Sequence, residues 1–284
     1  MLQLTLIISL QEHAMTTQKL IALDLDGTTL NRAGALTPQT IKTLRATSQA
    51  GHLVVLTTGR PDAISVPFYD QIGLDAPMIN FNGALVHKPH QHWQYEHQDT
   101  IQVPTALALR EFKQDFDINL MVAEGKQLMV ADHGFQNVPF FPDMPNPTTF
   151  LNEQGLTHAP ISVTMFIKET TLMPLQRAIE ARYPQLTPKT WGSWSGEHAA
   201  LEVTAGETSK SRSLAYVAEQ YHIDRDNIIA FGDDLNDLDM LAFAGTGVAM
   251  QNAKPEILAV ADDVTKLDND QDGVAAYLAD HLAM

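Results

Sequence analysis

The sequence predicts an α/β protein in which a parallel sheet is wrapped by helices and interrupted by an inserted α+β block. Residues 19–23, 52–57 and 227–231 are short, apolar and rich in Ile, Val and Leu, as strands covered on both faces are. Helical patterns lie between or after these segments, and this alternation favours a parallel sheet. The stretch 84–200 has a different pattern, and it predicts the inserted block.

Two helices of the parallel part have recognisable ends. We expect Thr37 to cap the first helix, Pro38 to lie in its first turn and Gly51 to end it. A second helix is expected after residues 208–209, where the chain carries an apolar stripe at helical spacing. This stripe consists of Leu214, Val217, Ala218 and Tyr221.

The inserted block contains both kinds of element. We expect helices over residues 106–116 and 172–183, and a proline-rich loop over 139–147. The expected strands cover residues 120–123, 127–130, 161–167 and a segment around 191–195. Because Met15 is an alternative start, we predict an N-terminal extension at 1–14. The rest divides into a core domain at 15–83 and 201–284 and an inserted domain at 84–200.

Composition limits the function classes. The 284 residues are enough for two domains, and a hydrophobic content of 44% allows a sizeable core. A net charge of -16 argues against nucleic acid and anionic membranes as partners. The apolar N-terminus lacks a basic start and a cleavage site, and no apolar run reaches the length of a membrane span. The absence of cysteine fits a reducing compartment, so we expect a cytoplasmic protein. The sequence does not predict the oligomeric state.

Polar side chains follow each predicted core strand. The first strand leads into Asp24 and Asp26, the second into residues 57–60 and the third into residues 232–237. Ligands of open parallel sheets bind at the carboxyl ends of the strands, so we expect these segments to meet in one cleft. Lys210, at a predicted helix start, is the cation expected nearby.

The residue types at these strand ends indicate phosphoryl transfer. Clustered carboxylates without His or Cys suit a hard cation such as Mg²⁺. A lysine and a helix N-terminus suit a phosphate group. Catalysis of phosphoryl transfer consists mostly of positioning and charge neutralisation, and an aspartate can itself be the nucleophile.

Four motifs, in this order, resemble those of the haloacid dehalogenase-like superfamily. They are DLDGTTL at 24–30, TTGR at 57–60, TSK at 208–210 and GDDLND at 232–237. Three further segments are similar to the Cof-type phosphatases: NFNGALV at 80–86, GVAMQNA at 247–253 and DGVAAYL at 272–278. The resemblance covers nearly the whole chain from Lys19. It implies a Rossmann-like core with an inserted α+β cap domain.

The resemblance also implies catalytic and metal-binding roles. Asp24 would be the nucleophile that attacks phosphorus. Asp26 would protonate the leaving alcohol and then deprotonate the water that hydrolyses the aspartyl-phosphate. Mg²⁺ would be held by the Asp24 carboxylate, the Asp26 main-chain carbonyl and Asp233.

A second group of residues is implied to bind or support the phosphate. The phosphate ligands would be Thr58, Gly59, Lys210 and Asn236. Gly27 would let the backbone approach the phosphate, and Asp237 would position Lys210 or a water molecule.

Several positions leave alternatives open. Ser211, Asp234 and Gln251 stand where similar sequences commonly have glycine. Asp234 either adds charge beside the metal or faces solvent. Arg60 either supports its own loop or contacts substrate, and Asn82 either holds the junction of core and cap or faces substrate.

The sequence therefore predicts a Mg²⁺-dependent phosphatase of small phosphorylated metabolites, such as sugar phosphates. A sugar phosphomutase and a non-catalytic phospholigand-binding protein are the alternatives. Residues of the cap, rather than the motifs, are expected to set substrate choice. The candidates for that role are Trp191, Trp194, Glu197 and His198.

Overall fold

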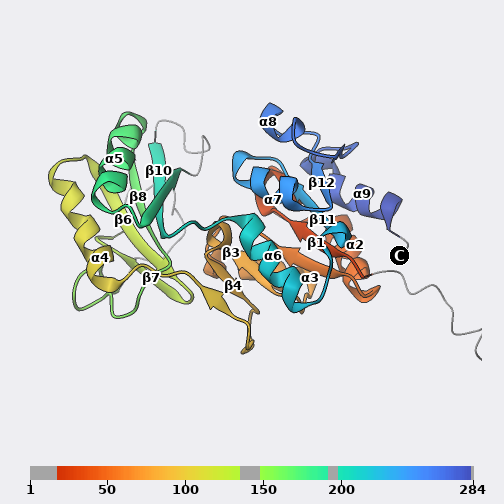
Figure 1. Ribbon diagram of the computed structural model, residues 1–284, viewed down its shortest axis with the longest axis horizontal. Coiled ribbons are helices and arrows are strands. Elements are labelled where there is room, and N and C mark those ends of the chain that lie inside the picture. The colour runs from red at the N-terminus through yellow and green to blue at the C-terminus, as the bar shows by residue number, and fades with distance from the viewer. Residues whose placement is uncertain (1–17, 135–147, 191–197, 283–284) are drawn as a thin grey trace, which may run out of the picture.

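A computed structural model describes residues 18–134, 148–190 and 198–282. Figure 1 shows two sheet-containing parts, joined near β3, β4 and the start of α6. The alternative start at Met15, the loop 139–147 and the strand expected around 191–195 lie outside the described residues, as do Trp191, Trp194 and Glu197. No described helix has the length and apolar character that a membrane span requires.

The first part contains a five-stranded parallel sheet in the order β13-β12-β11-β1-β2. Its strands are β1 (Leu20–Leu23), β2 (Leu53–Leu56), β11 (Ile228–Gly232), β12 (Thr246–Ala249) and β13 (Asp263–Val264). A parallel bridge from Thr57 to Ile79 connects its β2 edge to β3 (Met78–Asn80). From there β3, β4 (Leu85–His87) and β5 (His97–Gln98) form a small antiparallel sheet.

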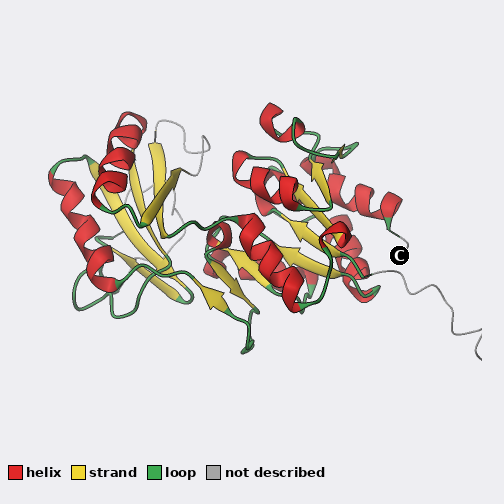
Figure 2. Cartoon of the chain, in the orientation of Figure 1, coloured by secondary structure: helices red, strands yellow, loops and turns green. Residues whose placement is uncertain are grey.

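Helices cover both faces of the parallel sheet (Figure 2). One face packs against α2 (Pro38–Gln49), α3 (Asp62–Ile72) and α9 (Gly273–His281). The other packs against α6 (Lys210–Gln220), α7 (Leu238–Phe243) and α8 (Pro255–Leu258). Because both faces are covered, all four residues of β1 are buried. The sequence of this strand is therefore apolar along its whole length.

The second part is built on an antiparallel sheet in the order β7-β6-β8-β10-β9. Its strands are β6 (Ile118–Gly125), β7 (Leu128–Ala131), β8 (Ser162–Lys168), β9 (Leu186–Thr190) and β10 (His198–Ala205). α4 (Val103–Ala108), the turn Leu109–Gln114 that continues it, and α5 (Glu169–Arg182) pack on one face. Met121, Met165 and Leu201 point to that face, and their neighbours alternate to the other.

The predicted fold class is confirmed, since a parallel α/β core carries an inserted α+β part. The first core helix is also as expected: Thr37 Oγ1 accepts the backbone N–H of Thr40 at 3.1 Å. The division of the chain at residues 84 and 200 stays a prediction. β4 and β5 pair with β3, and β10 continues the second sheet to Ala205.

Candidate active site

The site begins where β1 and β11 end side by side. Leu23 of β1 is in register with Phe231 of β11, and the backbone N–H of Asp24 donates to the Phe231 carbonyl at 3.1 Å. Asp24 lies one residue after Leu23 and Asp233 lies two residues after Phe231, so both emerge at the carboxyl edge of the sheet. The Thr29 hydroxyl, at the end of the following loop, donates to the Asp24 carbonyl at 2.5 Å and fixes the loop.

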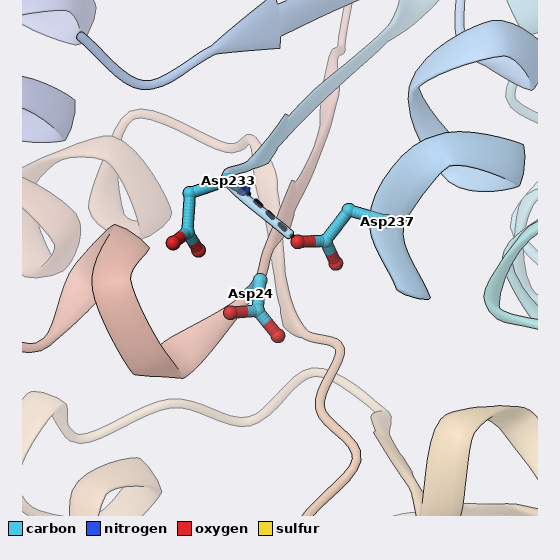
Figure 3. Close-up of side chains that lie close together, drawn as sticks. All are labelled: Asp24, Asp233 and Asp237. Carbon is cyan, nitrogen blue, oxygen red and sulfur yellow. Dashed lines mark hydrogen bonds between the residues drawn. The ribbon is translucent and has the colours of Figure 1, made fainter. Parts of the chain in front are cut away.

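Three carboxylates converge at this edge. Figure 3 shows Asp24, Asp233 and Asp237, and one oxygen from each lies within 4.8 Å of the others. Lys210, the first residue of α6, points into the same place. Its Nζ donates to Asp24 Oδ1 and Asp237 Oδ1, each at 2.6 Å. The Lys210 side chain is fully buried, so this ammonium is a built-in counter-charge for the two carboxylates.

Asp237 has both carboxylate oxygens committed to the protein. Oδ1 accepts from Lys210, while Oδ2 accepts the backbone N–H groups of Asp233 and Asp234 at 3.0 and 3.2 Å. The close packing requires glycine at 232, because a Cβ there would lie 2.4 Å from the Cβ of Asp237. These contacts place Asp237 as a support for Lys210 and for the loop that carries Asp233.

Gly27 lets the first loop pass directly over Asp233. Its φ of 73° lies in the left-handed region, and a Cβ would lie 2.2 Å from Asp233 Oδ2. The neighbouring Thr28 donates its hydroxyl to Asp233 Oδ1 at 2.9 Å, and Asn252 Nδ2 donates to the Gly27 carbonyl at 2.8 Å. Sequence reasoning did not assign Thr28 or Asn252 to the site, although both lie inside the matched motifs.

The charges at this edge do not balance. When all are ionised, the three carboxylates and the Lys210 ammonium leave two net negative charges. Burial, followed by the Asp237 charge, raises the pKa of Asp24 well above its usual value, and Lys210 opposes that shift. Burial and the Asp237 charge also raise the pKa of Asp233, to about 7. Burial lowers the pKa of Lys210, but the Asp237 and Asp24 charges raise it by more.

This imbalance fits a divalent cation. A divalent ion would cancel the excess negative charge, and carboxylate oxygens without His or Cys suit a hard metal. Because both oxygens of Asp237 are committed, Asp24 and Asp233 are the carboxylates that suit direct contact with the ion. The donor set therefore fits the expected Mg²⁺.

Asp26 lies apart from this cluster and pairs with Arg60. The guanidinium donates to both of its carboxylate oxygens, from Nε at 2.7 Å and from Nη2 at 2.5 Å. The Asp26 side chain is 59% exposed, in contrast with the buried Lys210. Burial lowers the pKa of Arg60, but the Asp26 hydrogen bond and charge raise it by more. Arg60 thus lies in the loop that follows β2 and binds the loop that follows β1 through Asp26.

The expected phosphate ligands from the second and fourth motifs meet at Asn82. Asn236 Nδ2 donates to Asn82 Oδ1 at 3.1 Å, and a Cβ on Gly59 would lie 3.0 Å from the same oxygen. Asn82 has a φ of 51°, which turns the backbone sharply after β3. The Thr58 hydroxyl is buried and accepts the backbone N–H of Arg60 at 3.1 Å.

Two further side chains complete the surroundings. Asn82 Nδ2 donates to Glu202 Oε2 at 3.2 Å, so a residue of the second sheet reaches the core at this point. Asp234 pairs with Lys254 at 2.5 Å and accepts the backbone N–H of Leu235. Asp234 thus caps a turn and pairs with Lys254. Nothing in the sequence distinguishes Glu202 beyond its place in an alternating strand.

A family comparison decides the identity of this arrangement. The model of the haloacid dehalogenase-like hydrolases matches residues 21–278, which is most of the chain and includes all four motifs. The chain belongs to this family. The resemblance inferred from the motifs is confirmed, and the protein is an enzyme of the phosphatase type found in this family.

The haloacid dehalogenase-like chain has relatives and structural neighbours over nearly its full length. It is 28% identical over 267 residues to the 5-amino-6-(5-phospho-D-ribitylamino)uracil phosphatase YitU of Bacillus subtilis, covering 93% of this chain and 98% of that protein. It is 32% identical over 278 residues to the pyridoxal phosphate phosphatase YbhA of Escherichia coli, covering 94% and 99%. A crystal structure of a haloacid dehalogenase-like hydrolase from Bacteroides thetaiotaomicron superposes with a TM-score of 0.81 at 25% identity, covering 94% and 100%.

Proposed function

We propose that this enzyme is a Mg²⁺-dependent phosphatase that hydrolyses small phosphorylated metabolites through an aspartyl-phosphate on Asp24. The observation that carries the proposal is the buried Lys210 ammonium, 2.6 Å from both Asp24 and Asp237, with Asp233 in the same cluster. A nucleophilic carboxylate needs its charge balanced without being protonated, and this contact supports that role.

The phosphoryl group would be held by Thr58, Gly59, Lys210 and Asn236. Gly59 and Asn236 are both adjacent to Asn82, and Lys210 contacts the nucleophile directly. Thr29 and Lys210 hold Asp24 from opposite ends, at its carbonyl and at Oδ1. Catalysis would then come from positioning and from neutralising the charge of the phosphoryl oxygens.

Asp26 would transfer the protons of the two steps. It would protonate the leaving alcohol as Asp24 attacks phosphorus, and then accept a proton from the water that attacks the aspartyl-phosphate. The Arg60 fork pairs with its ionised carboxylate, which is the form needed for the second step. In the first step the carboxyl must be protonated, so this ion pair has to open.

Mg²⁺ would be held by the Asp24 carboxylate, the Asp26 main-chain carbonyl and Asp233. When bound, the ion supplies positive charge that offsets the carboxylates and polarises a phosphoryl oxygen. Thr28 would keep Asp233 in place by donating to its carboxylate, and Asp237 would do so by accepting the backbone N–H of Asp233. The expected cytoplasmic location stays a prediction.

The proposal is tested by p-nitrophenyl phosphate hydrolysis with Mg²⁺ and with a chelator. We expect turnover that the chelator abolishes and Mg²⁺ restores. Asp24→Asn should lose activity by at least about 10³-fold, since the nucleophile is removed. The exposed aspartate variant Asp226→Asn is the control and should retain activity. Full activity of Asp24→Asn, or turnover that is indifferent to the chelator, would contradict the proposal.

The two alternatives give different outcomes. An obligate phosphomutase would release no phosphate from a sugar monophosphate in the absence of a bisphosphate activator. A non-catalytic binding protein would bind phosphorylated ligands without turning them over. The two relatives named above are called phosphatases of different phosphorylated compounds, so a panel of phosphometabolites ranked by kcat/KM is needed to identify the substrate.

A further inference from the structure

The turn after β12 binds both loops that carry the proposed metal ligands. This turn consists of residues 250–254. The backbone N–H groups of its first and last residues donate to the carbonyls of Gly232 and Asp233, each at 3.0 Å. Between these two anchors, Asn252 Nδ2 donates to the Gly27 carbonyl at 2.8 Å. The turn therefore connects the loop that follows β11 to the loop that follows β1.

Both ends of the Asn252 amide have a partner. While Nδ2 donates to Gly27, Oδ1 accepts the backbone N–H of Asn269 at 3.1 Å. Asn269 Nδ2 in turn donates to the carbonyl of Leu30, at the end of the first loop, at 2.8 Å. One partner of Asn252 needs a donor and the other needs an acceptor, which an amide supplies and a carboxylate of the same shape does not. The first loop is thus held at two of its carbonyls by asparagine side chains.

The Gly27 backbone is a place where the first loop needs such support. It lies between the Asp26 carbonyl, a proposed Mg²⁺ ligand, and Thr28, whose hydroxyl donates to Asp233 Oδ1 at 2.9 Å. Gly27 has a φ of 73° and a ψ of -2°, and a glycine populates both signs of φ with similar ease. Rotation at Gly27 would turn the Asp26 carbonyl and the Thr28 hydroxyl away from Asp233. A hydrogen bond to the Gly27 carbonyl opposes that rotation.

A second contact from the same end of the chain continues this support. Asp272, directly before α9, accepts the hydroxyls of Thr37 and Thr40 with its Oδ1, the latter at 2.8 Å. Thr37 and Thr40 lie at the start of α2, the first helix after the nucleophile loop. Asn252 and Asp272 belong to segments that have no part in the proposed chemistry. Their contacts show that both segments brace the chain that follows Asp24.

We propose that Asn252 is a positioning residue for the metal site. Through the Gly27 carbonyl it holds the Asp26 carbonyl and Asp233 in the arrangement that binds Mg²⁺. This inference rests on the proposed function and deepens it. Without Asn252, only a fraction of the molecules would have the loop in the binding arrangement, and the apparent affinity for the ion would fall by that fraction. Saturating Mg²⁺ would restore the arrangement, so the loss would appear in Mg²⁺ binding rather than in kcat.

Calorimetric titration of Mg²⁺ into the full-length enzyme, without substrate, tests this role. We expect Asn252→Ala to raise the Kd for Mg²⁺ about three- to tenfold, the range that the loss of one hydrogen bond corresponds to. In p-nitrophenyl phosphate hydrolysis, the half-saturating Mg²⁺ concentration should rise by the same factor. The kcat at saturating Mg²⁺ should fall by less than about twofold.

The neighbouring Gln251 provides a matched control. Gln251 is exposed like Asn252 and lies in the same turn, but its Nε2 donates to the Lys266 carbonyl at 3.1 Å and not to a loop of the site. Gln251→Ala should therefore keep the wild-type Kd for Mg²⁺. An equal rise in Kd for Gln251→Ala and Asn252→Ala would mean that any loosening of the turn has this effect, and it would overturn the inference.

Asn252→Asp separates the donor from the rest of the side chain. Aspartate has the same size and can still accept the N–H of Asn269, but its carboxylate cannot donate to Gly27. The added negative charge by itself would attract Mg²⁺, so a raised Kd in this variant assigns the effect to the lost donor. We expect the Kd to rise. A Kd equal to or below that of the wild type would overturn the inference.

The remaining outcomes distinguish this inference from the proposed function. An unchanged Kd for Mg²⁺ in Asn252→Ala would overturn the inference and leave the proposed function standing. If Asn252→Ala does not fold, as judged by circular dichroism, Asn252→Asp decides in its place. A wild-type enzyme that binds no Mg²⁺ would overturn the proposed function, and this inference with it.

Discussion

Replacing Glu124 by glutamine should stabilise the folded protein at neutral and alkaline pH. Burial raises the pKa of Glu124 from 4.5 to about 8, and the Glu202 charge adds to this rise. The Thr164 hydrogen bond opposes it. The folded state therefore binds the Glu124 proton more tightly than the unfolded chain does. Glutamine keeps the size of the side chain and the oxygen that Thr164 contacts, but it has no proton to lose.

The sign and size of the effect follow from these two pKa values. Between pH 4.5 and about 8 the unfolded chain releases the proton while the folded chain retains it. Because the folded state then binds more protons, the free energy of unfolding falls as the pH rises through this window. The slope is about 1.4 kcal/mol per pH unit in the middle of this window and smaller near the two pKa values, so the wild-type protein should lose ~3.5 kcal/mol relative to Glu124→Gln between about pH 5 and pH 8.

Urea unfolding at a series of pH values, in the presence of a chelator, measures this difference. The gap between Glu124→Gln and wild type should be small near pH 5 and widen steadily toward pH 8. Glu180→Gln, in the same part of the chain, should track the wild-type curve at every pH. A gap that stays constant from pH 5 to pH 8 would show that Glu124 titrates normally, and it would refute the reasoning.

Three changes at the metal and nucleophile cluster have separable readouts. Gly27→Ala places a methyl group against Asp233 in a left-handed backbone position, so kcat should fall at least about tenfold, measured with p-nitrophenyl phosphate and saturating Mg²⁺. Lys210→Met leaves Asp24 and Asp237 without their counter-charge and should lower the free energy of unfolding by about 3–5 kcal/mol in urea, besides abolishing turnover. Mg²⁺ should raise the melting temperature of the wild-type protein by ligand linkage but have little effect on Asp233→Asn, as followed by differential scanning fluorimetry. An unchanged kcat of Gly27→Ala would contradict the first expectation, and an unchanged urea curve of Lys210→Met would contradict the second. A rise in melting temperature with Mg²⁺ that is equal in Asp233→Asn and wild type would contradict the third.

The parallel core could be predicted because its strands are covered on both faces. Such strands must be apolar along their whole length, so residues 19–23 and 227–231 stand out, and they correspond to β1 and β11 within a residue at each end. The helix α3 was not predicted. Its sequence contains Pro67 and lacks a clear apolar stripe, so the local pattern does not favour a helix.

The site could be predicted only where the chain itself brings residues together. Asp24 and Asp233 follow adjacent parallel strands, so strand order alone makes them neighbours. The Asp26–Arg60 pair depends on the path of two loops, and the sequence left the role of Arg60 open. Glu202 was missed for a different reason: a glutamate in an alternating strand usually faces solvent, and its burial is set by the contact between sheet and core.

The charges around the site explain how a protein with a net charge of -16 can take an anionic substrate. Both cations named at the site are already paired, Lys210 with Asp24 and Asp237, and Arg60 with Asp26. Together with Asp233, these groups carry more negative than positive charge, so the protein alone offers a phosphate dianion no net attraction. In the proposed mechanism the divalent ion therefore does more than assist the chemistry. It cancels the excess negative charge of these groups, so a phosphate dianion meets no net repulsion from them at the site.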